Sequence, residues 1–150
     1  MSVFADTSFL CALYRVQDNS PEAYKLAGAL KEPITVSSLV LFEFRQSVRL
    51  QAFRFSSDRT QGYPQRDAAR VLEAVQANLE AGAVVVAPAD WPEVHSLAEE
   101  LSSRHTAAMG IRSMDMLHVA TALHLGAKQF LTFDGKQAAL AKISGLKVKP

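Results

Sequence analysis

The sequence has little of several features that mark specialised classes of protein. Cys11 is the only cysteine, so no disulfide can form within the chain, and its apolar neighbours are typical of a buried thiol. The usual zinc sites need more cysteine and histidine ligands than this sequence offers. No stretch approaches the ~18 consecutive apolar residues of a membrane span, and the chain starts with a strand-like run, without a basic and apolar leader. We therefore expect no membrane association and a cytoplasmic location.

Charge of one sign is not in large excess either, because the formal net charge is only +1. The positive side chains are nevertheless unevenly spread. From Gly126 onward, five lysines are accompanied by a single acid, Asp134. Six arginines crowd the middle of the chain: Arg45, Arg49, Arg54, Arg59, Arg66 and Arg70. This distribution fits a side of the protein that faces phosphate groups, and it fits a solvated surface equally well.

Length and composition indicate one ordinary globular domain that spans residues 1–150. A chain of this length buries roughly 68–70% of its unfolded surface on folding, so it needs no disulfide or structural metal. Hydrophobic residues make up 49% of the chain and charged residues 21%, as in many soluble proteins. The sequence contains no internal repeat and no low-complexity tract.

Short apolar runs alternate with segments of helical periodicity along the whole chain. Strands are predicted at 3–5, 34–36, 83–87, 130–133 and 146–148. Helices are predicted at 9–14, 20–30, 39–55, 67–81, 91–105 and 135–142, and between a capping Ser113 and Gly126. Loops are predicted at 56–65 and 106–110. The alternation predicts an α/β fold with three layers, in which helices cover a short-stranded, mostly parallel sheet of about five strands.

Two acids lie where a predicted strand ends and a predicted helix begins. Asp6 follows the strand at 3–5, and Asp134 follows the strand at 130–133. In α/β folds with parallel sheets, binding sites form beyond the carboxyl ends of the strands, near the point where the strand order reverses. The alternative is that each aspartate only caps a helix, and the run from Asp134 to Gln137 is close to a capping box.

Two further acids lie in helices. Asp115 is in the first turn of its helix, where a carboxylate can also serve to complement the helix dipole. Glu43 interrupts an otherwise apolar helix start, and a buried carboxylate is costly unless it is paired or binds a metal. An arginine, Arg45 or Arg49, is the alternative partner for Glu43. Arg45 is only two positions away, however, and would face another side of the helix.

If these four carboxylates meet, their repulsion requires a cation, because close carboxylates raise one another's pKa unless a positive charge keeps them ionised. Oxygen ligands select hard ions, so we expect Mg²⁺, with Mn²⁺ as a possible substitute. Such ions commonly bind phosphates, and two ions ~3.5–4 Å apart can activate water for phosphodiester cleavage. The pattern therefore indicates a metal-dependent hydrolase that acts on a phosphodiester.

Polar residues near the acids have supporting roles in this interpretation. Thr7, Ser8 and Thr132 could orient a carboxylate or hold a water, or they could be plain turn residues. Arg112 could contact a phosphate, or it could be a solvated residue at a helix start. His118 lies one turn beyond the helical aspartate and could approach the edge of the site, although its apolar surroundings favour a structural histidine.

Three segments together resemble the PIN-domain nucleases, and more closely the VapC toxins of bacterial toxin–antitoxin pairs. The segments are VFADTSFL at 3–10, SLVLFEF at 38–44 and DMLHVATALHLGAKQFLTFD at 115–134. The resemblance spans the chain and is strongest over the last third. It implies the PIN-like version of the three-layer fold and an acidic quartet around Mg²⁺. By resemblance, that quartet is Asp6, Glu43, Asp115 and Asp134.

The resemblance also implies an activity and partners. The implied activity is metal-dependent endoribonuclease cleavage of RNA, such as tRNA or another structured RNA. The implied partner is a small antitoxin whose tail blocks the active site, and the toxin is expected to be a homodimer. Two departures are visible: the segment 56–65 looks longer than in compact toxins, and no extra acid precedes Asp115.

Two alternatives were weighed against a nuclease. A non-catalytic PIN-like module that binds RNA or a partner protein stays open, although the presence of all four acids argues against it. Other α/β phosphate enzymes fit poorly. A haloacid-dehalogenase-like phosphatase needs Asp-x-Asp after its first strand, where this chain has Asp6-Thr7-Ser8, and a receiver domain needs an acidic pair there.

Overall fold

The centre of the fold is a five-stranded sheet in which neighbouring strands run parallel. The structure is a computed structural model, and it describes residues 3–150. The strands are β1 (Val3–Ala5), β2 (Ile34–Val36), β3 (Val84–Val86), β4 (Gln129–Leu131) and β5 (Lys147–Lys149). Their order across the sheet is β3-β2-β1-β4-β5, and each of the four pairs is parallel. The predicted short-stranded parallel sheet is confirmed.

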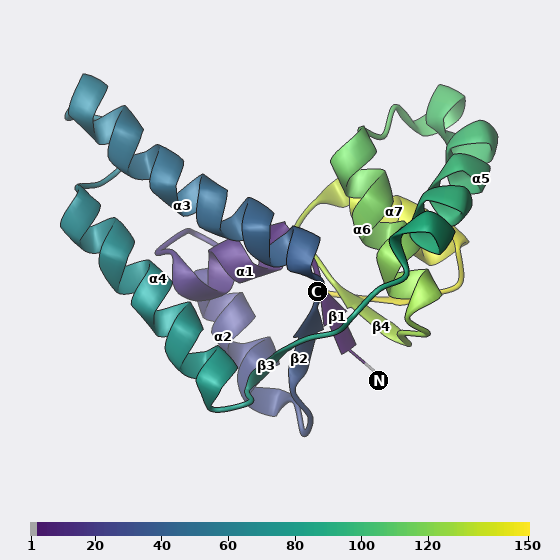
Figure 1. Ribbon diagram of the computed structural model, residues 1–150, viewed down its shortest axis with the longest axis horizontal. Helices are drawn as coiled ribbons and strands as arrows, with labels where there is room; N and C mark the ends of the chain where they lie inside the picture. Colours follow the sequence, from purple (N-terminus) through teal and green to yellow (C-terminus); the bar gives the residue numbers. More distant parts are fainter. Residues whose placement is uncertain (1–2) are drawn as a thin grey trace.

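Helices cover both faces of the sheet. They are α1 (Thr7–Tyr14), α2 (Ser20–Ala29), α3 (Ser38–Ser57), α4 (Gln65–Glu80), α5 (Trp91–Met109), α6 (Ser113–His124) and α7 (Gly135–Ile143). Figure 1 shows α1 to α4 on one side of the strands and α5 to α7 on the other. The predicted three-layer α/β/α arrangement is thereby confirmed. No helix within residues 3–150 has the length and apolar character needed to cross a lipid bilayer.

The connections between strands place a switch point in the middle of the sheet. From β1 the chain adds β2 and then β3 on one side, and it then returns to place β4 on the other side of β1. Strand order therefore reverses between β1 and β4. Because all strands are parallel, their carboxyl ends share one edge, and the loops after β1 and β4 diverge to opposite faces there. This edge is where the α/β rule places a binding site.

Buried aromatic and branched side chains hold the central strands between the helical layers. The three residues of β1 are buried, and Phe4 stacks on Phe130 of β4 with ring centroids 6.0 Å apart. On the side of α1, Phe9 stacks on Phe133 with centroids 5.8 Å apart. Cys11 is buried in the same core, as predicted for a structural thiol. These contacts fix β1 and β4, and thus the two acids that follow them.

One predicted loop is wrong. The segment 106–110 was predicted to be flexible, but α5 continues through it and ends at Met109, with Gly110 in the left-handed conformation at φ 62°. The segment forms helix because Ala107, Ala108 and Met109 favour helix, and Thr106 and Met109 are half-buried. Ser113 is also not the helix cap. Arg112 takes that position without a side-chain bond, and Ser113 is the first helical residue.

The predicted loop at 56–65 is shorter in the structure, where only 58–64 lie between α3 and α4. The two helices form a hairpin that extends away from the sheet (Figure 1). The hairpin loop passes so close to α3 at Gly62 that only glycine fits there. Gly62 has φ +63°, and an added Cβ would lie 2.1 Å from the backbone oxygen of Gln51. The next residue, Tyr63, donates its N–H to that same oxygen at 3.3 Å.

Gly62→Ala is therefore expected to destabilise the fold by about 2 kcal/mol, since alanine would add left-handed strain and a clash with backbone that cannot rotate away. The matched control is Gly28→Ala in α2, where an added Cβ meets no atom within 4 Å. That change should be neutral or stabilising by ~0.5–1 kcal/mol. Urea unfolding of both variants measures the difference. Equal stability of Gly62→Ala and wild type would contradict this account of the loop.

Candidate active site

Asp6 is held in a fixed orientation at the carboxyl end of β1. It is the N-cap of α1, its side chain is fully buried, and its Oδ1 accepts the N–H of Phe9 at 2.9 Å. Ser8 Oγ donates to Oδ1 at 2.7 Å, and Thr132 Oγ1 donates to Oδ2 at 2.6 Å. The cap interpretation of Asp6 is thus correct as local structure. A cap needs only one of these bonds, and the two hydroxyl donors hold the carboxylate further.

Burial raises the pKa of Asp6, and the hydrogen bonds from Thr132, Phe9 and Ser8 act in the opposite direction. A buried carboxylate of this kind is costly to ionise without a positive charge nearby. Among the described residues, His118 is the group whose positive charge, when protonated, would lower the pKa of Asp6. The hydroxyls orient the group, but they do not remove the cost of its burial.

Glu43 reaches the same region from the start of α3. Its Oε1 lies 2.9 Å from His118 Nε2, and the glutamate side chain is 31% exposed. His118 Nε2 also lies 3.3 Å from Thr7 Oγ1, which places α1, α3 and α6 around one imidazole. Arg45 is not the partner of Glu43. As expected, it faces another side of the helix, where it donates to Gln76 on α4.

The imidazole is a member of the site. His118 is completely buried, and its hydrogen bond lowers the pKa of Glu43, outweighing the burial of that carboxylate. Its second ring nitrogen, Nδ1, is buried and has no hydrogen-bond partner among residues 3–150. The sequence favoured a structural histidine, and the observed contact with Glu43 was missed because it joins residues 75 positions apart.

Asp115 and Asp134 are brought together by α6 and α7. Asp134 is the N-cap of α7, and its Oδ1 accepts the backbone N–H of Gln137 at 2.8 Å. The side-chain Nε2 of Gln137 donates to Asp115 Oδ1 at 2.9 Å. One residue therefore contacts both acids. Gln137 was not among the predicted site residues.

The pKa of Asp115 is influenced by two of the other three predicted acids, Asp134 and Glu43. Burial raises the pKa of Asp115, and the charge of Asp134 is the next largest influence and raises it further. Glu43 also raises the pKa of Asp115, whereas His118 and Arg112 lower it. Such influences require proximity. The predicted helical acid is therefore close to two of the other predicted carboxylates.

The hydroxyl residues predicted to support the acids are all in contact with the site. Thr132 Oγ1 accepts the N–H of Asp134 at 2.9 Å while it donates to Asp6, so it joins the acids that follow β1 and β4. Ser8 Oγ accepts the N–H of Phe133 at 2.9 Å. Arg112 is exposed at the start of α6 and makes no side-chain capping bond.

The four acids thus lie at one edge of the sheet, each bonded to a donor from the protein. Within residues 3–150, no three histidine, cysteine, aspartate or glutamate side chains are arranged as they stand to hold a metal ion. The donors are nevertheless mostly oxygen atoms, from carboxylates and hydroxyls, and the one imidazole, His118, contacts Glu43 through Nε2. This set suits a hard divalent cation such as Mg²⁺ or Mn²⁺. The mutual effect of Asp115 and Asp134 is the repulsion that such a cation would relieve.

Comparison with solved structures finds the same fold in several bacterial proteins. VapC20 from Mycobacterium tuberculosis, described as a toxin that cleaves the sarcin–ricin loop, matches with a TM-score of 0.69 and 22% identity over 99% of this chain and 100% of its own. FitAcB from Neisseria gonorrhoeae matches with a TM-score of 0.63 and 18% identity, over 99% and 96%. VapBC2 from Rickettsia felis, bound to a DNA fragment from its promoter, matches with 0.64 and 16%, over 99% and 98%.

At the level of sequence, a search of curated proteins finds no match. The family model of the PIN domain, in contrast, matches residues 3–143, which include all four acids and every strand except β5. The chain belongs to the PIN domain family.

Proposed function

We propose that this protein is a metal-dependent endoribonuclease and acts as a toxin of the VapC type. The observation that carries the proposal is a hydrogen-bond network at the switch point of the sheet. In it, Thr132 bonds Asp6 and the backbone of Asp134, His118 contacts Glu43, and Gln137 bonds both Asp115 and Asp134. Membership of the PIN domain family and the likeness to VapC20 support it. Cleavage of a phosphodiester needs charge stabilisation at the phosphate, and an oxygen-lined metal site supplies it.

The residues that would hold Mg²⁺ or Mn²⁺ are the four carboxylates, with Asp6 and Asp115 as the central pair. When bound, the ion would supply an activated water and a stabilised leaving oxygen. Asp6 is already oriented by Ser8 and Thr132. Glu43 is paired with His118 at a partly exposed position, so it can turn toward a cation without crossing the core.

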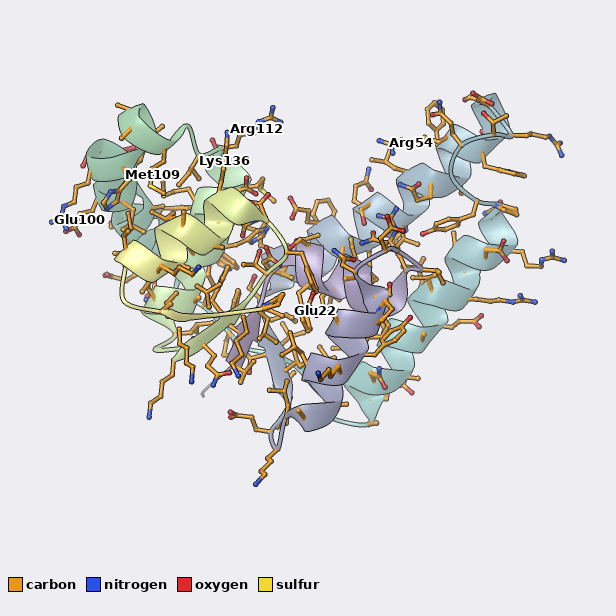
Figure 2. All side chains as sticks on the ribbon, turned by 180° about the vertical axis from the view of Figure 1, so that it is seen from behind. Glu22, Arg54, Glu100, Met109, Arg112 and Lys136 are labelled. Carbon is orange, nitrogen blue, oxygen red and sulfur yellow. The ribbon has the colours of Figure 1, made fainter. Side chains whose placement is uncertain are left out.

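Basic side chains lie on two parts of the molecule, which we call the α3 arm and the α6–α7 arm. Their placement suits an RNA strand that passes over the acids. Arg54 lies on the α3 arm, whereas Arg112 and Lys136 lie on the arm formed by α6 and α7 (Figure 2). Arg112 begins the helix that carries Asp115, and Lys136 follows Asp134 by two positions. Phosphates bound at these positions would place the backbone across the acidic edge.

The partners follow from the same proposal. The likeness to FitAcB and to VapBC2 supports a small antitoxin as the protein partner. We propose a homodimer as the assembly of the toxin itself, which sedimentation equilibrium of the purified chain tests directly. The RNA expected as substrate is a structured one, such as a tRNA or another folded RNA.

Asp115→Asn is expected to reduce RNA cleavage by at least about 100-fold, because the amide keeps the shape of the side chain but removes a negative ligand of the ion. EDTA should abolish cleavage by the wild type, and Mn²⁺ or Mg²⁺ should restore it. The measurement is cleavage of a labelled structured RNA, resolved on a gel.

The matched control is Asp67→Asn, which changes a partly exposed aspartate in the first turn of α4. It should cleave RNA like the wild type. Cleavage that persists in EDTA and in Asp115→Asn would contradict the proposal. RNA binding without any cleavage by the wild type would instead favour the non-catalytic PIN-like module.

Arg112→Glu is expected to weaken RNA binding and to lower the slope of log K against log salt concentration by about 1, because one phosphate contact is lost. Lys128→Glu is the matched control, since Lys128 is exposed directly before β4, at the opposite edge of the sheet from the acids. Fluorescence anisotropy in EDTA at several salt concentrations measures both. An equal loss in the two variants would reject a path over the acidic edge.

A further inference from the structure

Gln137 has an unusual double role in the site. Its backbone N–H donates to Asp134 Oδ1 at 2.8 Å, and its side-chain Nε2 donates to Asp115 Oδ1 at 2.9 Å. The residue is buried, with only 4% of its surface exposed. In the described part of the chain, no other residue is hydrogen-bonded to both of these acids.

The position of Gln137 in its helix explains how it reaches both acids. It is the third residue of α7, where a glutamine usually folds back to accept the N–H of the capping residue in a capping box. Here the N–H of Asp134 donates to Thr132 Oγ1 instead, at 2.9 Å. The amide of Gln137 is therefore released from the cap, and it turns toward Asp115 on α6.

The other end of the amide has no partner. Oε1 of Gln137 is buried and accepts no hydrogen bond within the described chain. An unpaired buried acceptor destabilises a fold, so the place of this side chain is not explained by stability alone. A donor brought by a ligand, such as a water on a hydrated divalent cation, would satisfy the oxygen.

We propose that Gln137 is a positioning residue that sets the placement of Asp115 relative to Asp134 for binding a divalent cation. A neutral amide suits this task. It holds the carboxylate by a hydrogen bond but, unlike a lysine or arginine, does not neutralise the negative charge that attracts the cation. The charge of Asp134 raises the pKa of Asp115. The side-chain amide of Gln137 holds Asp115, while the backbone N–H of the same residue holds Asp134. This inference rests on the proposed function, since it assigns a role within the same metal site.

The test compares Gln137→Met with wild type in Mn²⁺ binding, measured by calorimetry and by the electron paramagnetic resonance of free Mn²⁺. Methionine preserves the volume but cannot donate, so affinity for Mn²⁺ should fall by about 10-fold or more, as for other residues that orient metal ligands. RNA affinity in EDTA should stay unchanged, because the fold and the basic arms are intact. Gln137→Ala is measured in parallel, in case methionine is not accommodated.

The matched control is Gln51→Met, which replaces another buried glutamine, 8% exposed, far from the acids on α3. It should bind Mn²⁺ like the wild type. Wild-type Mn²⁺ affinity in folded Gln137→Met or Gln137→Ala would overturn the inference, as would an equal loss in Gln51→Met. Failure of the wild type itself to bind Mn²⁺ would instead reject the proposed function.

Discussion

The structure depends on one topological constraint, the reversal of strand order between β1 and β4. Parallel strands present their carboxyl ends at a single edge, and the reversal sends the chain after β1 and β4 to opposite faces. Asp6 and Asp134 are the residues found there. The helices that pack on the two faces, α3 and α6, bring Glu43 and Asp115 to the same edge. Negative charge is thereby concentrated by the fold itself.

This concentration of charge explains the polar network around the acids. Ser8 and Thr132 orient Asp6, His118 pairs with Glu43, and Gln137 joins the remaining two aspartates. These donors satisfy the carboxylates individually but add little positive charge, so the repulsion felt by Asp115 persists. The oxygen atoms of the site are held in place, but their negative charge is not compensated. Such a site is suited to a small cation.

Sequence reasoning could predict the fold and the acids because both follow from local pattern. Asp6 and Asp134 follow short apolar strands, and Glu43 interrupts an apolar helix start, so each is conspicuous in isolation. The partners could not be predicted, because the bonds of His118 and Gln137 depend on how distant helices pack. The capping-box pattern after Asp134 is half correct. Asp134 caps α7 and accepts the N–H of Gln137, but Thr132 accepts the N–H of Asp134 in place of the Gln137 side chain. The segment 106–110 was wrongly predicted as a loop because its small residues suggested flexibility, although Ala107, Ala108 and Met109 favour helix.

The most direct measurement is anomalous diffraction from crystals of the protein grown with Mn²⁺. The account predicts an anomalous peak at the carboxyl edge of β1 and β4, with carboxylate oxygens of Asp6 and Asp115 at bonding distance. The same crystals soaked in EDTA should lose the peak. A fully ordered edge without a peak at saturating Mn²⁺, or a peak that contacts neither aspartate, would contradict the central claim that these acids form one metal site.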